Sequence, residues 1–308
     1  MPSSAILEAI GNTPLVELRH LRPPGGARVV VKCEGGNPTG SMKDRMALAM
    51  IEGPRRAGRL AAGHPVVELT GGSTGASLAL VCGALGHPLT IVTSDAVARE
   101  KVDMTRALGA TVEVLKTPEG KVHPGLVPQM RARVEEIAKQ TGAFWTDQFN
   151  NCYQLEGYAP LAQEVLRACP DVSHFVQVVG TAGSAMGVSR ELRKVRPGLR
   201  VTLVEPASSP WLGEGRGGSH GVEGTAGLLH PPLLDRALYD DVLAVDEAEG
   251  RQVARRLARE EGLFAGTSTG LNVLAACRIA AQLPPDAVVL TIAVDSGLKY
   301  LAGDLYRS

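Results

Sequence analysis

The sequence lacks an excess of charge of either sign, a long apolar run and any close pair of cysteines. Its 308 residues include 32 lysines and arginines and 32 aspartates and glutamates, so the formal net charge is zero. A neutral chain has no bulk attraction for nucleic acid or for an acidic membrane surface. No apolar run approaches the length of a membrane span. We therefore expect neither a nucleic-acid partner nor a membrane partner.

The five cysteines are scattered and form no Cys-x-x-Cys pair, so neither a zinc site nor a disulfide framework is indicated. The seven histidines do not cluster at ligand spacing, and we expect no metal. The first residues, MPSSAILEAIGNTP, do not show the basic and apolar pattern of a signal peptide. These features fit a reducing cytoplasm best.

Short apolar strands alternate with helical segments along the chain, and the connections between them are short. This alternation predicts an α/β protein with parallel, doubly wound sheets. The length is enough for about two domains, which we place at residues 1–150 and 151–308. Residues 210–227 are glycine-rich without periodicity and predict a long loop. The principal predicted helices are 76–82, 97–108, 128–139, 161–168, 246–261 and 271–282, and the principal predicted strands are 29–31, 65–69, 89–92, 111–115, 174–179, 201–204 and 288–294.

The segment from Gly35 to Arg45 reads GGNPTGSMKDR and passes from turn residues into a run of good helix formers. The Ser41 hydroxyl can cap this helix by accepting an amide of the first turn. We expect Lys43 within that first turn, where the positive end of the helix dipole lowers the pKa of a lysine. A partly desolvated lysine there can form a Schiff base with a carbonyl. An ordinary surface lysine is the alternative that the segment alone leaves open.

Residues 32–45, KCEGGNPTGSMKDR, resemble the cofactor-lysine segment of the cysteine synthase family, whose members use pyridoxal phosphate for β-replacement. The resemblance extends from IGNTPL at residues 10–15 to DSG at residues 295–297. It implies the type II fold of pyridoxal-phosphate enzymes, similar to the tryptophan synthase β subunit, with about residues 13–34 crossing to the second domain. It also implies that Lys43, not Lys32, binds the cofactor and moves protons, and that the protein is a homodimer.

Three glycine-rich turns begin at Thr70, Gly180 and Gly266, and each is predicted to join a strand to a helix start. Ligands of open parallel sheets bind at the carboxyl ends of strands, and helix starts offer free amides to anions. The GTAGS turn at residues 180–184 is the best phosphate candidate, although a plain tight turn is the alternative. It resembles the family's phosphate cup, usually GTGGT, and this implies phosphate contacts from Gly180, Thr181, Ala182, Gly183 and Ser184.

Two of these motifs depart from the family pattern. Ala182 stands in place of a cup glycine, which is tolerable if its φ is negative. TGGSTG at residues 70–75 resembles the family's TSGNTG loop, which grips the substrate carboxylate; this implies substrate contacts from Thr70, Gly71 and Thr74. Ser73 replaces the asparagine that hydrogen-bonds the cofactor's 3′-oxygen, and Gly71 replaces a serine. These two changes bear on the substrate more than on the cofactor.

Two further motifs follow in the family's order. DQFNN at residues 147–151 resembles a DQFxN stretch, which implies that Gln148 helps to hold the substrate carboxylate; by itself it is a satisfied polar residue. The family's TTGPE segment is replaced by EGYAP at residues 156–160. GTSTGLN from Gly266 resembles GISSGA, which implies that Ser268 faces the pyridine nitrogen. A hydroxyl does not hold that nitrogen protonated as an aspartate would, and this favours β-elimination over transamination.

The resemblance leaves three hypotheses for the function. The first is β-replacement on an activated serine by a thiol-class nucleophile, with cysteine made from O-acetylserine and sulfide. The second keeps the cofactor but changes the chemistry to β-elimination of serine or cysteine, or to cystathionine formation. The third is a pyridoxal-phosphate-binding protein of weak activity with a regulatory role. Gly71, Ser73 and the segment around Tyr158 motivate the second hypothesis, and Ser73 motivates the third.

Overall fold

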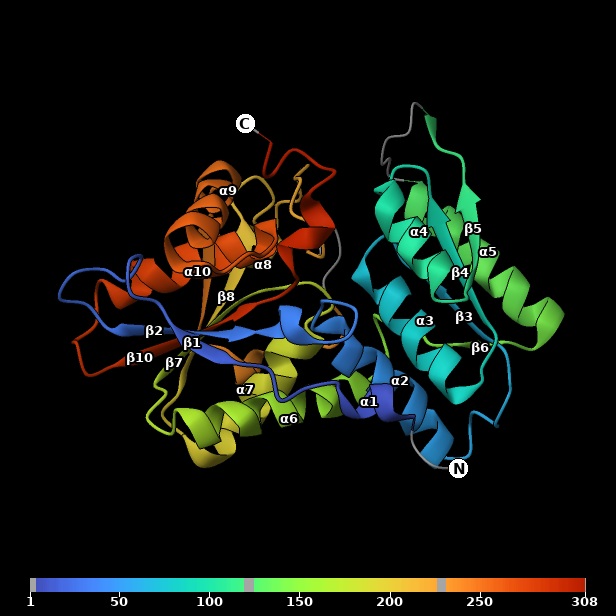
Figure 1. Ribbon diagram of the computed structural model, residues 1–308, viewed down its shortest axis with the longest axis horizontal. Helices are drawn as coiled ribbons and strands as arrows, with labels where there is room; N and C mark the ends of the chain where they lie inside the picture. The colour runs from blue at the N-terminus through green and yellow to red at the C-terminus, as the bar shows by residue number, and fades with distance from the viewer. Residues whose placement is uncertain (1–3, 119–124, 226–230, 308) are drawn as a thin grey trace. The chain divides into compact units, whose positions relative to one another are not determined.

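The computed structural model describes residues 4–118, 125–225 and 231–307 (Figure 1). Its described residues divide into two compact units. The first unit comprises the described parts of residues 1–10 and 43–157, and the second those of residues 11–42 and 158–308. Residues 11–42, which include the segment predicted to cross over, thus belong to the second unit.

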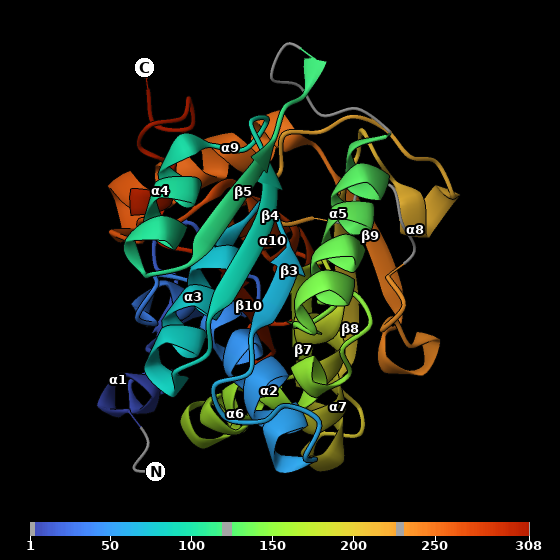
Figure 2. The same ribbon diagram turned by 90° about the vertical axis from the view of Figure 1, so that its right-hand side faces the viewer.

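The first unit is a four-stranded parallel sheet in the order β5-β4-β3-β6. Figure 2 shows α3 and α4 on one side of this sheet and α5 on the other. Apolar side chains of β3 and β4 pack with those of α5, among them Val67, Val92 and Val134. The elements are α1 (Ala5–Glu8), α2 (Lys43–Arg56), β3 (Val66–Leu69), α3 (Ser73–Leu85), β4 (Leu89–Ser94), α4 (Arg99–Ala107), β5 (Thr111–Leu115), α5 (Leu126–Thr141) and β6 (Phe144–Trp145).

The second unit is a six-stranded sheet in the order β1-β2-β10-β7-β8-β9. β1 is antiparallel to β2, and the other neighbours are parallel. Val30 of β2 lies opposite Leu290 of β10, so an early strand and the last strand are neighbours in the interior of one sheet. The strands are β1 (Leu15–Glu17), β2 (Arg28–Cys33), β7 (His174–Val178), β8 (Arg200–Pro206), β9 (Asp241–Val245) and β10 (Val288–Ala293).

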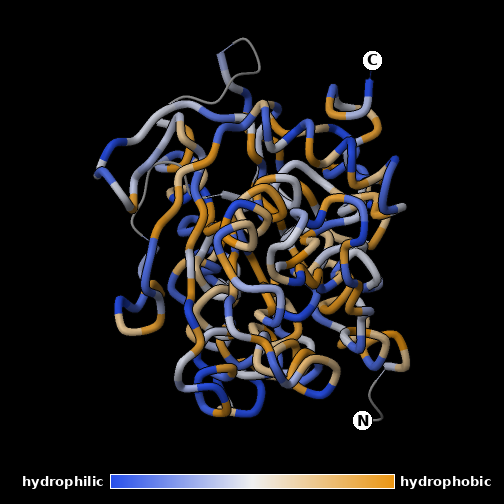
Figure 3. Tube along the Cα trace, turned by 90° about the vertical axis from the view of Figure 1, so that its left-hand side faces the viewer, coloured by the Kyte–Doolittle hydropathy of each residue, from blue (hydrophilic) through white to orange (hydrophobic). Residues whose placement is uncertain are grey.

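Helices cover both faces of this second sheet, with α9 and α10 on one face and α6 and α7 on the other (Figure 1). The core beneath α10 joins Val176, Leu271 and Val289, all fully buried. Hydrophobic colour follows the interior segments of the chain, and many outer turns are hydrophilic (Figure 3). The helices are α6 (Tyr153–Ala168), which spans the boundary between the units, α7 (Gly183–Val195), α8 (Trp211–Glu214), α9 (Glu247–Arg256) and α10 (Thr267–Ala280).

The predicted α/β alternation is confirmed, but several boundaries are wrong. α6 begins at Tyr153 rather than residue 161 and continues through Gly157 and Pro160. Gly157 lets α6 approach α2, because a Cβ there would lie 2.6 Å from the carbonyl oxygen of Arg45. The predicted loop 210–227 contains the short helix α8, and residues 226 and 227 lie outside the described residues. Among the described residues, no helix combines the length and hydropathy needed to cross a membrane.

Candidate functional site

The loop before Lys43 is fixed to the second unit by a buried polar network. Glu34 accepts hydrogen bonds from the Thr13 hydroxyl at 2.6 Å and from the Asn37 side-chain amide at 2.9 Å. Asn37 in turn accepts the amide of Gly11 at 2.8 Å. All the side chains in this network are buried, so each hydrogen bond replaces one lost to water. The GNTP motif therefore fixes the path of the loop.

The end of the same loop is tied to the last strand. The Ser41 hydroxyl donates to Asp295 Oδ1 at 2.6 Å, and the amide of Met42 donates to the carbonyl of Val294 at 3.0 Å. Lys43 follows as the first residue of α2, which confirms the predicted first-turn position. The predicted capping of α2 by Ser41 stays a prediction. The two residues that precede Lys43 are thus each held by a hydrogen bond.

The other lysine of this segment, Lys32, has a structural role. Its side chain is 2% exposed, its amine lies 2.6 Å from Glu164 Oε2, and it donates a hydrogen bond to the carbonyl of Thr13. The carboxylate and the carbonyl occupy this buried amine inside the fold. Lys32 therefore supports the loop and is a poor candidate for carbonyl chemistry.

The first glycine-rich turn joins β3 to α3 in the first unit. Thr70 directly follows the strand, and its hydroxyl accepts a hydrogen bond from the amide of Gly72 at 3.1 Å. α3 begins at Ser73, with Gly72 in the N-cap position. Ser73 and Thr74 thus lie in the first turn of the helix, where backbone amides have no intrahelical acceptor. The predicted strand–turn–helix arrangement is confirmed here, and it suits a carboxylate ligand.

Gln148 lies beside this turn and joins it to the segment after β6. The Thr74 hydroxyl donates to Gln148 Oε1 at 2.9 Å, and Gln148 Nε2 donates to the carbonyl of Leu69 at 2.9 Å. Both Thr74 and Gln148 are buried. One hydrogen of the Gln148 amide is left beyond the bond to Leu69, because a primary amide carries two. The structure therefore brings together two of the residues predicted to bind the substrate.

Glu68, which the sequence reasoning missed, supports Gln148 from inside the sheet. Its carboxylate accepts the Thr146 hydroxyl at 2.7 Å and the amide of Gln148 at 2.8 Å. It also accepts the amide of Leu69 at 2.7 Å and the Trp145 indole at 3.2 Å. Burial raises the pKa of Glu68 to about 7, although these hydrogen bonds lower it. Glu68 thus fixes the strand end and the segment of Gln148 together.

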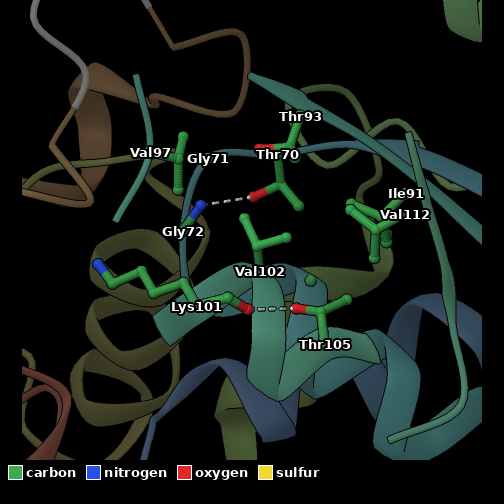
Figure 4. Close-up of a pocket in the computed structure, with 11 residues that line it drawn as sticks. Thr70, Gly71, Gly72, Ile91, Thr93, Val97, Lys101, Val102, Thr105 and Val112 are labelled. Atoms are coloured by element: carbon green, nitrogen blue, oxygen red, sulfur yellow. Dashed lines mark hydrogen bonds between the residues drawn. The ribbon is translucent and has the colours of Figure 1, made fainter. Parts of the chain in front are cut away.

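A small pocket opens beside the same turn, with room for about one water molecule. Gly71, Gly72 and Val97 lie on one side of it, and Ile91 and Val112 on the other (Figure 4). A Cβ on Gly71 would lie 3.0 Å from Val97 Cγ2. The place that the family gives to a serine side chain is therefore closed by an apolar side chain.

The second glycine-rich turn joins β7 to α7 in the second unit. α7 begins at Gly183, and the Thr181 hydroxyl accepts the amide of Gly183 at 3.4 Å. A Cβ at Gly180 would overlap the carbonyl oxygen of Gly224, so only glycine fits beneath that loop. Gly180 is therefore required for packing, whatever its part in binding an anion.

Ala182 has a positive φ of 66°, so the negative φ expected from the sequence is wrong. It is the N-cap of α7 and adopts the left-handed conformation, in which a side chain costs about 1–2 kcal/mol. A left-handed residue next to helical ones turns successive amides towards one point and forms an anion-binding concavity. The strain is thus located where the sequence predicts phosphate, which is typical of functional sites.

The third turn, at Gly266, does not follow a strand, and this prediction is wrong. Ala265 makes only an isolated bridge with Ser296, because the segment between the preceding helical turn and α10 is too short to pair further. α10 nevertheless begins at Thr267, so the buried Ser268 lies in its first turn. The Thr269 hydroxyl accepts the amide of Val294 at 3.0 Å.

Asn272 holds the start of α10 against the carboxyl ends of two neighbouring strands. Its side chain is fully buried, accepts the amide of Val178 at 2.6 Å and donates to the carbonyl of Ile292 at 2.8 Å. Val178 ends β7, and Ile292 lies near the end of β10. Ser268 and the turn at residues 180–184 therefore both lie at the carboxyl edge of one sheet.

The donor set of the second unit fits the anionic end of a phosphate-bearing cofactor. The first-turn amides of α7 have no intrahelical acceptors, and the Ser184 hydroxyl stands among them. Gly180 and Gly183 leave the backbone uncovered there. No acidic side chain occurs in residues 180–184, and the first turn of α7 has none. The residues present therefore suit a phosphate.

Comparison with known proteins agrees with this geometry. The model of the family described as "Pyridoxal-phosphate dependent enzyme" matches residues 6–295. The chain is 35% identical to a probable cysteine synthase of Bacillus subtilis over 97% of its length and 96% of that protein. It is 36% identical to the O-ureido-L-serine synthase of Streptomyces lavendulae, covering 98% and 92% of the two chains. The crystal structure of O-acetylserine sulfhydrylase isoform 3 from Entamoeba histolytica aligns with a TM-score of 0.92 at 31% identity, covering 98% and 91%.

The fold is that of a pyridoxal-phosphate enzyme of fold type II. The chain belongs to the pyridoxal-phosphate dependent enzyme family, and its relatives within that family include cysteine synthases.

Proposed function

We propose that this enzyme replaces the β-substituent of an activated serine and makes cysteine from O-acetylserine and sulfide. The observation that carries the proposal is the placement of Lys43 as the first residue of α2, directly after a loop held by Asp295 and Val294. The names of the relatives, cysteine synthase and O-acetylserine sulfhydrylase, support this choice of reaction. The distinctive turn at Gly71 and Ser73 bears on which substrate is preferred.

Pyridoxal phosphate, when bound, supplies an aldehyde for amino groups and a ring that takes up electrons. We assign its covalent attachment to the Lys43 amine and its phosphate to the turn Gly180–Ser184. When it is bound, the Ser73 hydroxyl would contact its 3′-oxygen and the Ser268 hydroxyl would contact its ring nitrogen. The hydroxyls of Ser73 and Ser268 each lie on the first turn of a helix, where the helix dipole favours electronegative groups.

The substrate carboxylate is assigned to the first turn of α3. The Thr74 amide lies in this first turn and would donate to it, and the Thr70 hydroxyl stands at the same helix start. The remaining hydrogen of the Gln148 amide gives it a further donor. Fixed donors of this kind orient the substrate without reorganising during the reaction.

The proton transfers are assigned to the Lys43 amine. It removes the proton from the α-carbon of the substrate as a general base and returns it after the nucleophile has added. Acetate leaves with the electron pair of the bond between carbon and oxygen, and sulfide forms the new bond to the β-carbon. Atoms and charge balance as O-acetylserine and the hydrosulfide ion, HS⁻, give cysteine and acetate.

The direct test is cysteine formation by the purified protein loaded with pyridoxal phosphate. O-acetylserine, O-phosphoserine, serine and cysteine are supplied in turn, each with and without sulfide. Rapid, sulfide-dependent cysteine formation from O-acetylserine supports the proposal, and Lys43→Ala should abolish it. The proposal would be contradicted if no cysteine formed from O-acetylserine, O-phosphoserine or serine in the presence of sulfide.

A second candidate is β-elimination, which one feature of the structure favours. Residue 71 is glycine, so the turn offers no serine hydroxyl there to a substrate, and a Cβ at this position would lie 3.0 Å from Val97 Cγ2. Pyruvate released from serine or cysteine without any added nucleophile would identify this reaction. The cytoplasmic location and the homodimer stay predictions from the sequence.

A further inference from the structure

Gln177 is a buried polar residue of strand β7, between Val176 and Val178. Its side chain is 0% exposed, and it lies three residues before the turn that begins at Gly180. Its Nε2 donates to Ser184 Oγ at 2.7 Å and lies 3.8 Å from Met42 Sδ. A buried amide next to the predicted phosphate turn calls for an explanation that packing alone does not give.

The hydrogen bond from Gln177 restricts the proton of Ser184. A serine hydroxyl has one proton to donate and lone pairs that accept. Because Gln177 already donates to Ser184 Oγ, the proton of Ser184 must point elsewhere. Without such a donor, a serine in a first helical turn can turn its proton to a nearby backbone carbonyl.

The amide oxygen of Gln177 makes this arrangement costly for the stability of the fold. Among the described residues Gln177 Oε1 is buried without a hydrogen-bond partner. Turning the amide over would pair Oε1 with Ser184 but would leave Nε2 without an oxygen acceptor. A buried polar atom without a partner destabilises a fold, so an apolar residue would serve packing better.

We propose that Gln177 is a positioning residue that directs the Ser184 hydroxyl proton towards the phosphate held by the turn Gly180–Ser184. The inference rests on the proposed function, because it assumes that this turn holds the phosphate. Gln177 contacts no ligand in this proposal and acts through Ser184 alone. The proton of Ser184 then reaches the anion without first breaking a bond to the protein.

The test measures ligand affinity of the cofactor-free protein rather than turnover. Wild type, Gln177→Met, Ser184→Ala and the double variant are titrated with inorganic phosphate, pyridoxal phosphate and pyridoxal. Each single variant should weaken phosphate binding about tenfold to hundredfold, as expected for a hydrogen bond to a charged group. The double variant should be no weaker than Ser184→Ala, because both changes remove the same interaction. Affinity for pyridoxal, which has no phosphate, should not change.

Thr291→Val is a matched control. Thr291 is fully buried on the neighbouring strand β10 and donates to the carbonyl of Val176 in β7 at 2.8 Å. Its loss removes a buried hydrogen bond to the same strand as Gln177 but touches no group of the turn. Lower thermal stability with unchanged phosphate affinity is expected.

The following results decide whether Gln177 positions the Ser184 hydroxyl. The proposal is overturned if Gln177→Met binds phosphate as well as wild type while Ser184→Ala binds it less well, or if the two losses add. If Gln177→Met does not fold, Gln177→Asn, whose shorter side chain does not reach Ser184, should show the same loss of affinity. If wild type binds neither pyridoxal phosphate nor inorganic phosphate, the proposed function itself fails.

Discussion

The Thr74 hydroxyl donates a hydrogen bond to Gln148 Oε1 across 2.9 Å, and both side chains are buried. The two residues are 74 positions apart in the sequence. Their contact joins the helix start after β3 to the segment after β6. It also fixes which end of the Gln148 amide carries the hydrogens, since Oε1 accepts from Thr74 and Nε2 donates to Leu69.

Thr74→Val should therefore impair substrate binding more than cofactor binding. The change removes the donor to Gln148 Oε1 and leaves a buried acceptor unpaired, which costs about 1–3 kcal/mol. We expect the KM for O-acetylserine to rise about tenfold while the affinity for pyridoxal phosphate is unchanged. Thr105→Val is the control, because the Thr105 hydroxyl donates to the carbonyl of Lys101 in its own helix. An unchanged KM in Thr74→Val would contradict the assigned role.

Glu68 predicts a specific dependence of stability on pH. Burial raises its pKa from 4.5 to about 7, so between these values the folded protein keeps a proton that the unfolded chain has lost. The free energy of unfolding should then fall as pH rises through this interval, by about 3 kcal/mol from this group. Below about pH 4.5 the two states bind the proton equally, and the contribution is complete.

Urea unfolding of wild type and Glu68→Gln at pH 5 and pH 8 isolates this group. The glutamine does not titrate, so its stability relative to wild type should improve as pH rises from 5 to 8. A difference between the two proteins that is the same at both pH values would show that Glu68 is already ionised at pH 5.

Ala182→Gly should stabilise the protein slightly or leave its stability unchanged. Glycine removes the left-handed strain of about 1–2 kcal/mol at φ 66°, offset by about 0.4–1 kcal/mol from the freer unfolded chain. Ala185→Gly, in the regular helix α7, is the control and should destabilise by about 1 kcal/mol. Equal losses in both variants, measured by urea unfolding, would mean that Ala182 is not strained.

Gly71→Ser tests whether Val97 leaves room for a side chain at position 71. The added Cβ would lie 3.0 Å from Val97 Cγ2, so the single change should force Val97 to move and raise the KM for the amino-acid substrate about threefold to tenfold. Adding Val97→Ala should restore the KM, because it removes the obstructing methyl. Gly72→Ala is the control, since a Cβ there meets nothing within 4 Å. If the double variant is as impaired as Gly71→Ser, the contact with Val97 is not the cause.

The sequence predicted the parts of this site that are continuous in the chain. Turn residues followed by helix formers predicted the helix at Lys43 and the turns at Thr70 and Gly180, since local φ preferences and capping decide such positions. The expectation of a negative φ at Ala182 was wrong, because its packed surroundings impose a left-handed conformation against the local preference. The prediction that a strand precedes Gly266 was wrong, because the pairing of Ala265 with Ser296 stops after one residue.

Glu68, Gln177 and Asn272 were missed. Most partners of Glu68 and both partners of Asn272 lie far away in the chain, whereas Gln177 pairs with Ser184, seven positions on, across the turn between β7 and α7. Asn272, for example, bonds to Val178, which is 94 positions away. A signal was nevertheless present for the first two. Glu68 in VVEL and Gln177 in HFVQV are polar residues in buried strands that end at glycine-rich turns. A polar side chain there must have a partner, which marks it as part of a site.

The central claim is that the Lys43 amine forms the covalent bond to pyridoxal phosphate. The most direct test is borohydride reduction of the loaded protein, followed by peptide mapping with mass spectrometry. The account predicts one modified peptide, containing Lys43, and no trapped adduct in Lys43→Ala. A stable adduct on another lysine, such as Lys32 or Lys101, with Lys43 unmodified would contradict it.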